Sequence, residues 1–135
     1  LIKRDELETS KAETTKTLEV SNEENFDPEK TWQKGSYALR KLYHETKKPL
    51  FVIYTSSSCG PCHILKPQLH RVLNESNGKA IGVEIDIEND QDIAKQAEVS
   101  GTPTVHLFKN KELKKQWKGV KARSEYKSAL DELVD

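Results

Sequence analysis

The residues best suited to chemistry are two cysteines, Cys59 and Cys62, the only ones in a chain of 135 residues. A Gly-Pro pair separates them. The most apolar run of the sequence, residues 50–54, comes shortly before them, and a segment with helical spacing, residues 63–74, follows directly. The cysteines are therefore expected where a buried strand leads into a helix, and the free N–H groups at a helix N-terminus favour a thiolate.

Dithiol–disulfide exchange is one chemistry that this arrangement predicts. It requires an accessible thiolate as nucleophile and a second thiol that releases the substrate. A two-residue gap at the start of a helix exposes the first sulfur and tucks the second into the first turn. We therefore assign Cys59 as the attacking thiolate and Cys62 as the resolving thiol. Pro61 is tolerated between them because first-turn N–H groups have no partner within the helix.

Three alternatives remain open at the level of this motif. With His63 the cysteines fit the C-x-x-C-H pattern of haem attachment, with a second histidine as axial ligand because the chain has no methionine. They could bind zinc with His63 and a distant imidazole, although no second Cys-x-x-Cys completes a site. They could also be inert small hydrophobes. His44, His70 and His106 have no partner visible in the sequence and are interpreted as structural.

Composition and charge exclude several classes of protein. Apolar residues make up 34% of the chain and charged residues 33%, and the net charge is zero, so neither nucleic acid nor membrane is an expected partner. No apolar run approaches the ~20 residues of a membrane span, and the charged N-terminus does not resemble a signal peptide. The chain starts with Leu1 rather than Met, so we expect a piece of a longer protein.

The two parts of the chain differ in organisation. Residues 1–30 hold nine acidic and five basic side chains without periodicity, which predicts an acidic, mostly disordered linker. Helical and strand patterns alternate after it, with a helix ending near residue 45, strands at 50–54, 81–87, 104–108 and 113–117, and helices at 63–74, 90–97 and from Ser124. This order predicts an α/β fold with a mixed four- to five-stranded sheet and helices on both faces. We expect the isolated domain to be monomeric.

Two motifs together make the chain resemble the thioredoxin family: the Cys-Gly-Pro-Cys stretch and the Gly-Thr-Pro of residues 101–103. Lys66-Pro67 in the following helix, the Phe-Lys-Asn of residues 108–110 and Gly119 match the family pattern in the same order. The resemblance covers residues 35–135 as a thioredoxin domain, which leaves residues 1–34 as the linker.

The resemblance implies how a substrate is held. The bond between Thr102 and Pro103 is expected to be cis and to lie beside the cysteines, where its backbone pairs with a substrate segment as a short strand. The substrate-binding residues implied in this way are Gly60, Pro61, Gly101, Thr102 and Pro103.

Within the family, residues 35–45, 54–56, 83–88 and 119–121 are similar to the C-terminal thioredoxin domain of NADPH-thioredoxin reductase C, the fused reductase–thioredoxin of chloroplasts and cyanobacteria. This similarity implies FAD and NADPH in an upstream reductase domain and no cofactor in this chain. It implies 2-Cys peroxiredoxin as electron acceptor and the chloroplast stroma or cyanobacterial cytoplasm as location. The alternative is a non-catalytic module of the same fold that binds a partner or a metal.

Three positions depart from the family pattern. Ser58 stands where a tryptophan usually precedes the first cysteine, which makes the surface that grips substrates less apolar. Ile53 takes the place of a buried aspartate that serves proton transfer at the resolving thiol. Glu84 falls where the family usually has a lysine, and we hypothesise that it supplies the missing carboxylate near Cys62. The alternative for Glu84 is a solvated side chain at a strand edge, since glutamate is rarely buried.

Overall fold

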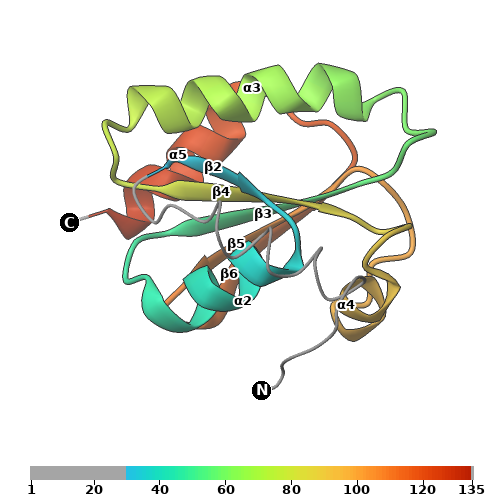
Figure 1. Cartoon of the computed structure of the whole chain (residues 1–135). Coiled ribbons are helices and arrows are strands. Elements are labelled where there is room, and N and C mark those ends of the chain that lie inside the picture. The colour runs from blue at the N-terminus through green and yellow to red at the C-terminus, as the bar shows by residue number, and fades with distance from the viewer. Residues whose placement is uncertain (1–29, 135) are drawn as a thin grey trace.

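The computed structural model describes residues 30–134, in which helices and strands alternate and build one five-stranded sheet (Figure 1). In chain order the elements are β2 (Trp32–Lys34), α2 (Ser36–Glu45), β3 (Leu50–Thr55), α3 (Cys62–Glu75), β4 (Ile81–Asp86), α4 (Gln91–Gln96), β5 (Thr104–Lys109), β6 (Glu112–Lys118) and α5 (Arg123–Leu133). Within the described residues, no helix combines the length and the apolar character that crossing a membrane requires.

The sheet has the strand order β2-β4-β3-β5-β6, with β3 at its centre. Strands β2 and β3 run parallel to β4, whereas β5 is antiparallel to both β3 and β6. Helices α3 and α5 cover one face of the sheet, and α2 and α4 lie on the other (Figure 1). The predicted α/β class and mixed sheet are confirmed, with five strands.

Strand β3 is buried along its whole length. Phe51 and Ile53 pack in the core under α3 and α5, whereas Val52 and Tyr54 pack in the core on the α2 side. Successive side chains of a strand point to opposite faces, so a central strand covered by helices on both sides needs apolar residues at every position. The prediction of a strand buried on both faces is therefore confirmed.

Strand β2 lies inside the range that the sequence assigns to the linker. Trp32 is in register with Gly82 of β4, where a Cβ would come within 2.6 Å of Leu73 and 3.0 Å of the indole ring. The absent side chain thus leaves the space that the indole fills. The folded part begins before residue 35, and the prediction missed it because three residues are too few to display a strand period. Residues 1–29 lie outside the described part.

Helix starts also differ from the prediction. Ser124 is not the cap of α5, because the helix begins at Arg123 with Ala122 in the cap position, and the Ala122 carbonyl accepts the N–H of Glu125 at 2.9 Å. Asp90 does hold the cap position of α4, but its carboxylate makes no capping bond and accepts a hydrogen bond from Ser36 instead. At Asp90 a tertiary contact with α2 thus replaces the local capping bond, whereas the start of α5 lies within two residues of the prediction, which is the usual variation of helix boundaries.

His106 of β5 is a buried polar side chain inside the core on the α2 side. It is 3% exposed, its Nδ1 has no hydrogen-bond partner among the described residues, and its ring contacts the rings of Tyr54 and Phe108 edge to face. Burial lowers the pKa of His106 below its usual 6.5, because the apolar surroundings disfavour the charged ring. The same surroundings raise the pKa of Tyr54 to about 12.

We expect His106 to make the fold sensitive to acid. The unfolded chain takes up a proton at this residue below about pH 6.5 while the folded chain resists it, so the free energy of unfolding falls as the pH drops through that value. Urea unfolding at pH 7.5 and pH 5.5 should show a smaller loss in His106→Phe than in the wild type, by up to about 1.4 kcal/mol, because pH 5.5 lies one unit below the usual pKa of histidine. His70 is present in both proteins and cancels in the comparison. Equal losses would contradict the prediction.

Candidate active site

The two cysteines lie at the junction of β3 and α3, and they are joined by a disulfide with their Cα atoms 5.4 Å apart. Cys62 is the first residue of α3, and Pro61 occupies the cap position before it. The Cys62 N–H donates to Cys59 Sγ at 3.2 Å. A first-turn N–H has no helical carbonyl to bond, so it is free to point at sulfur. The sequence prediction that a helix begins at the cysteines is confirmed.

Both sulfur-bearing residues are largely covered in the oxidised chain. Cys59 is 6% exposed and Cys62 is 1% exposed, so what access there is favours Cys59. The residues between them, Gly60 and Pro61, are exposed, and the space beside the Gly60 Cα is open. Another polypeptide therefore has room to approach the disulfide over this turn.

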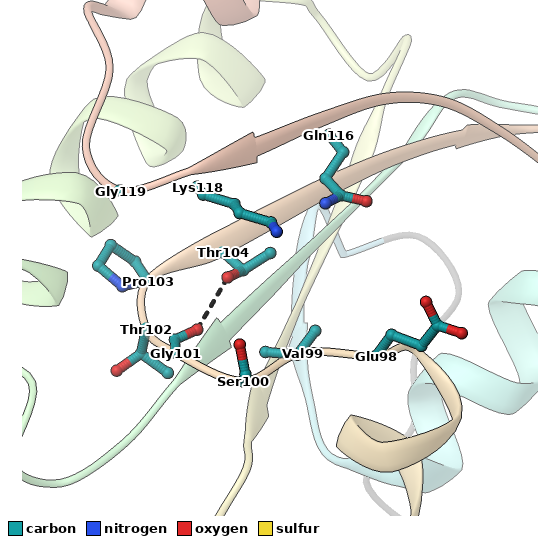
Figure 2. A pocket seen from close by; sticks show the side chains of 10 residues that line it. All are labelled: Glu98, Val99, Ser100, Gly101, Thr102, Pro103, Thr104, Gln116, Lys118 and Gly119. Carbon is teal, nitrogen blue, oxygen red and sulfur yellow. Dashed lines mark hydrogen bonds between the residues drawn. The ribbon is translucent and has the colours of Figure 1, made fainter.

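The second predicted motif lies next to the first. The Thr102–Pro103 bond is cis, as the resemblance implies, and the Thr102 and Ser56 hydroxyls are 3.3 Å apart. Because Ser56 belongs to the loop that carries Cys59, this contact ties the two motifs together. Behind the loop, Thr104 donates to the Gly101 carbonyl at 2.8 Å, as Figure 2 shows.

The loop just before Cys59 is polar. Ser58 is exposed where the family pattern has a tryptophan, and Ser57 donates to the Glu88 carboxylate at 2.8 Å. This last contact connects the cysteine loop to the loop that follows β4. No local pattern in the sequence points to Glu88, because the two loops meet only through the pairing of β3 with β4.

The side chain at position 53 is apolar and buried. Ile53 is 0% exposed and belongs to the core under α3 and α5, so the carboxylate of the usual family pattern has no counterpart there. In the pairing of β3 with β4, Ile53 lies directly opposite Glu84. Paired residues on neighbouring strands point to the same face of a sheet, so Glu84 faces α3.

Glu84 sits in a cluster of polar and aromatic groups beneath α3. Its carboxylate lies 2.7 Å from the Lys66 ammonium and accepts a hydrogen bond from the Trp32 indole N–H at 3.3 Å. The Glu84 side chain is only 13% exposed, which rules out a freely solvated carboxylate. His70 stacks on Trp32 with ring centroids 3.8 Å apart. Burial lowers the pKa of His70, and the nearby Glu84 opposes this in part.

Lys66 relates this cluster to the cysteines. It follows Cys62 by four residues on α3, and residues four apart lie on the same helix face. His63, which directly follows Cys62, is exposed. Within residues 30–134 no group of three or more histidine, cysteine, aspartate or glutamate side chains is placed to hold a metal ion.

Comparison with known proteins agrees with the motifs. The thioredoxin family model matches residues 31–132. NADPH-dependent thioredoxin reductase 3 of Arabidopsis thaliana is 50% identical over 109 residues, which cover 81% of this chain and 21% of that protein. Mitochondrial thioredoxin of Bos taurus is 33% identical over 89 residues, covering 66% of this chain and 54% of that protein. The match thus spans about a fifth of the length of the plant reductase and about half of the length of the mitochondrial thioredoxin.

Two solved structures share the fold. A mutant thioredoxin from Halobacterium salinarum aligns with a TM-score of 0.69 and 21% identity, covering 77% of this chain and 89% of that one. Chloroplastic thioredoxin z aligns with a TM-score of 0.70 and 21% identity, covering 77% and 95%. At this level of identity the likeness concerns the fold alone.

A disulfide at the N-terminus of a helix, beside a cis-proline loop on a mixed sheet, defines a thiol–disulfide oxidoreductase. The chain belongs to the thioredoxin family. Its higher identity to the plant reductase than to the mitochondrial thioredoxin agrees with the resemblance to the thioredoxin domain of a fused reductase. The family match favours redox chemistry at the cysteines over haem attachment or zinc binding.

Proposed function

We propose that the chain is the thioredoxin domain of a larger NADPH-dependent reductase and that it reduces disulfides in target proteins. The observation that carries this proposal is the Cys59–Cys62 disulfide at the start of α3, with the Cys62 N–H aimed at Cys59 Sγ. In the reduced chain the same N–H favours a thiolate on Cys59, and a thiolate is the form that attacks disulfides. The slightly greater exposure of Cys59 supports the same order of attack.

The reaction proceeds in two exchanges. Cys59 thiolate attacks one sulfur of the target disulfide, which breaks the target S–S bond, forms a mixed disulfide and releases the first target thiolate. Cys62 thiolate then attacks Cys59 Sγ, which forms the Cys59–Cys62 disulfide and releases the second target thiolate. Two electrons pass to the target, and its two thiolates take up the proton that Cys62 gives up and one proton from solvent.

The target segment binds over the turn and the cis-proline loop. Gly60, Pro61 and Gly101 are exposed, with open space beside both glycines, and Pro103 is held from behind by the Gly119 N–H, which donates to its carbonyl at 2.8 Å. A segment laid along Gly101–Pro103 as a short strand places its cysteine beside Cys59. Thr102 contributes its backbone, since its hydroxyl contacts Ser56.

Glu84 is proposed as the carboxylate that influences proton transfer at Cys62. It lies under α3 opposite Ile53 and contacts Lys66, which shares a helix face with Cys62. The Lys66 ammonium partly offsets its charge. A negative charge near the resolving thiol disfavours its thiolate, so Cys62 keeps its proton until the mixed disulfide has formed.

The electron source and acceptor follow from the relative. An upstream domain that binds FAD and NADPH reduces the Cys59–Cys62 disulfide, and this chain itself holds no cofactor. A 2-Cys peroxiredoxin is the proposed main acceptor, and the chloroplast stroma or a cyanobacterial cytoplasm the proposed location. Support for this comes from the 50% identity to the plant reductase.

The first test separates the two cysteines. In insulin reduction driven by dithiothreitol, the wild-type chain should turn over, and both Cys59→Ser and Cys62→Ser should lose activity. Only Cys62→Ser should accumulate a mixed disulfide with the target, because Cys59 still attacks but nothing resolves the intermediate. Mass spectrometry under non-reducing conditions identifies the adduct. Absence of turnover together with bound zinc by elemental analysis would favour a metal-binding module instead.

The second test concerns Glu84. In the reduced chain, titration of Cys62 followed by ¹³Cβ NMR should shift to a lower pKa in Glu84→Gln, because removal of a negative charge favours the thiolate. Lys66→Gln removes a positive charge and should shift the titration in the opposite direction. A purely structural role would not produce shifts of opposite sign. An unchanged Cys62 titration in Glu84→Gln rejects the role.

The third test concerns the electron path. The assay mixes this chain with NADPH, a 2-Cys peroxiredoxin and an FAD-containing reductase domain from a fused reductase–thioredoxin. Hydrogen peroxide is then added. NADPH oxidation should depend on the chain and should disappear with Cys59→Ser, since that variant cannot accept or pass electrons. If insulin is reduced in the same mixture but the peroxiredoxin stays oxidised, the acceptor assignment is wrong.

A further inference from the structure

A pocket of about 200 Å³ lies between the cis-proline loop and the end of β6 (Figure 2). Residues 98–104 form one wall, and the end of β6, with Gln116, Lys118 and Gly119, forms the other. The hydrogen bond from Gly119 to Pro103 holds these walls together. Because Gly101–Pro103 is the proposed binding loop for the target segment, a side chain of that segment can enter this pocket.

The pocket offers hydrogen-bond donors. Figure 2 shows the Lys118 ammonium and the Gln116 carboxamide directed over Thr104. Lys118 is exposed and forms no ion pair within residues 30–134. The Thr104 hydroxyl already gives its proton to the Gly101 carbonyl. A ligand that reaches this space therefore meets an ammonium without a partner among the described residues, and a carboxylate forms a charge-assisted hydrogen bond with such an ammonium.

Lys118 belongs to a lysine-rich stretch of the chain. Residues 109–121, which contain the β5–β6 hairpin, hold six lysines and one glutamate in a chain of zero net charge. Of these lysines, Lys114 pairs with Glu112 and Lys109 donates to the Leu133 carbonyl. Glu98 lines the opposite end, and Figure 2 shows its carboxylate turned away from Lys118. Among the residues that line the pocket Lys118 is thus the positive charge and Glu98 the negative one, and the Lys118 end favours an anion.

We propose that this pocket recognises an acidic side chain, aspartate or glutamate, next to the cysteine that Cys59 attacks in the target protein, and that Lys118 is the residue that sets this preference. The inference rests on the proposed disulfide reduction and refines it to a substrate class. Ser58 replaces the tryptophan that usually makes an apolar contact with the substrate. An ion pair at Lys118 would supply selectivity in place of that contact. Charge complementarity of this kind acts mainly through specificity and association rate.

The test uses three disulfide-bridged peptides that differ only in one residue beside the attacked cysteine, which is Glu, Gln or Lys. The full chain is kept reduced by dithiothreitol, and kcat/KM is measured for each peptide by chromatography. We expect the Glu peptide to exceed the Lys peptide by about two- to five-fold, the range of an exposed ion pair. The preference should shrink at high salt.

Variants separate Lys118 from general charge. Lys118→Gln should abolish the Glu preference, and Lys118→Arg should retain it. Lys115→Gln is the matched control, because this substitution removes the same charge from β6, but Lys115 lines a different pocket together with Trp117. Persistence of the preference in Lys118→Gln, or its equal loss in Lys115→Gln, would overturn the assignment.

A neutral small disulfide, 2-hydroxyethyl disulfide, distinguishes failure of this inference from failure of the proposed function. Lys118→Gln, Lys118→Arg and Lys115→Gln should all reduce this compound at the wild-type rate, because it carries no charged side chain. If the wild type reduces it but shows no preference among the peptides, the pocket assignment alone is wrong. If the wild type does not reduce it at all, the proposed function fails, and the inference fails with it.

Discussion

The register of strand β3 with its two neighbours is the constraint on which the site depends. β3 runs parallel to β4 and antiparallel to β5, with Thr55 opposite Asp86 and Tyr54 opposite Thr104. The end of β3, the end of β4 and the start of β5 therefore meet at one edge of the sheet. These three strand ends carry the loops of the site. The cysteine turn follows β3, the loop with Glu88 follows β4, and the cis-proline loop precedes β5. A slip by one residue would turn every side chain of β3 to the wrong core.

The reactive pair and its surroundings follow different rules. The turn between β3 and α3 keeps what thiol chemistry needs, which is a helix N-terminus with an N–H aimed at Cys59 Sγ. Ser58 is polar where the family pattern has a tryptophan, and the neighbouring Ser57 donates to Glu88. The turn itself thus keeps the geometry of the family, whereas the residue just before it departs from the family pattern.

The carboxylate beneath α3 also departs from the family pattern. At position 53 the core is closed by isoleucine, and a carboxylate enters from the neighbouring strand as Glu84, held by Lys66 and Trp32. Trp32 belongs to β2, so the first strand of the domain takes part in positioning this carboxylate. Burying a lone carboxylate is costly, and the lysine and the indole N–H together make its position tolerable.

The sequence by itself determined the reactive residues and the main elements. A cysteine pair between an apolar run and a helical pattern predicts its own local geometry, since strand and helix periods are properties of neighbouring residues. Only the tertiary structure decided what surrounds the pair. The short strand β2, the contact of Glu84 with Lys66 and the pocket beside Pro103 all join residues far apart in the chain. Such contacts depend on sheet register and strand order, and no local pattern encodes them.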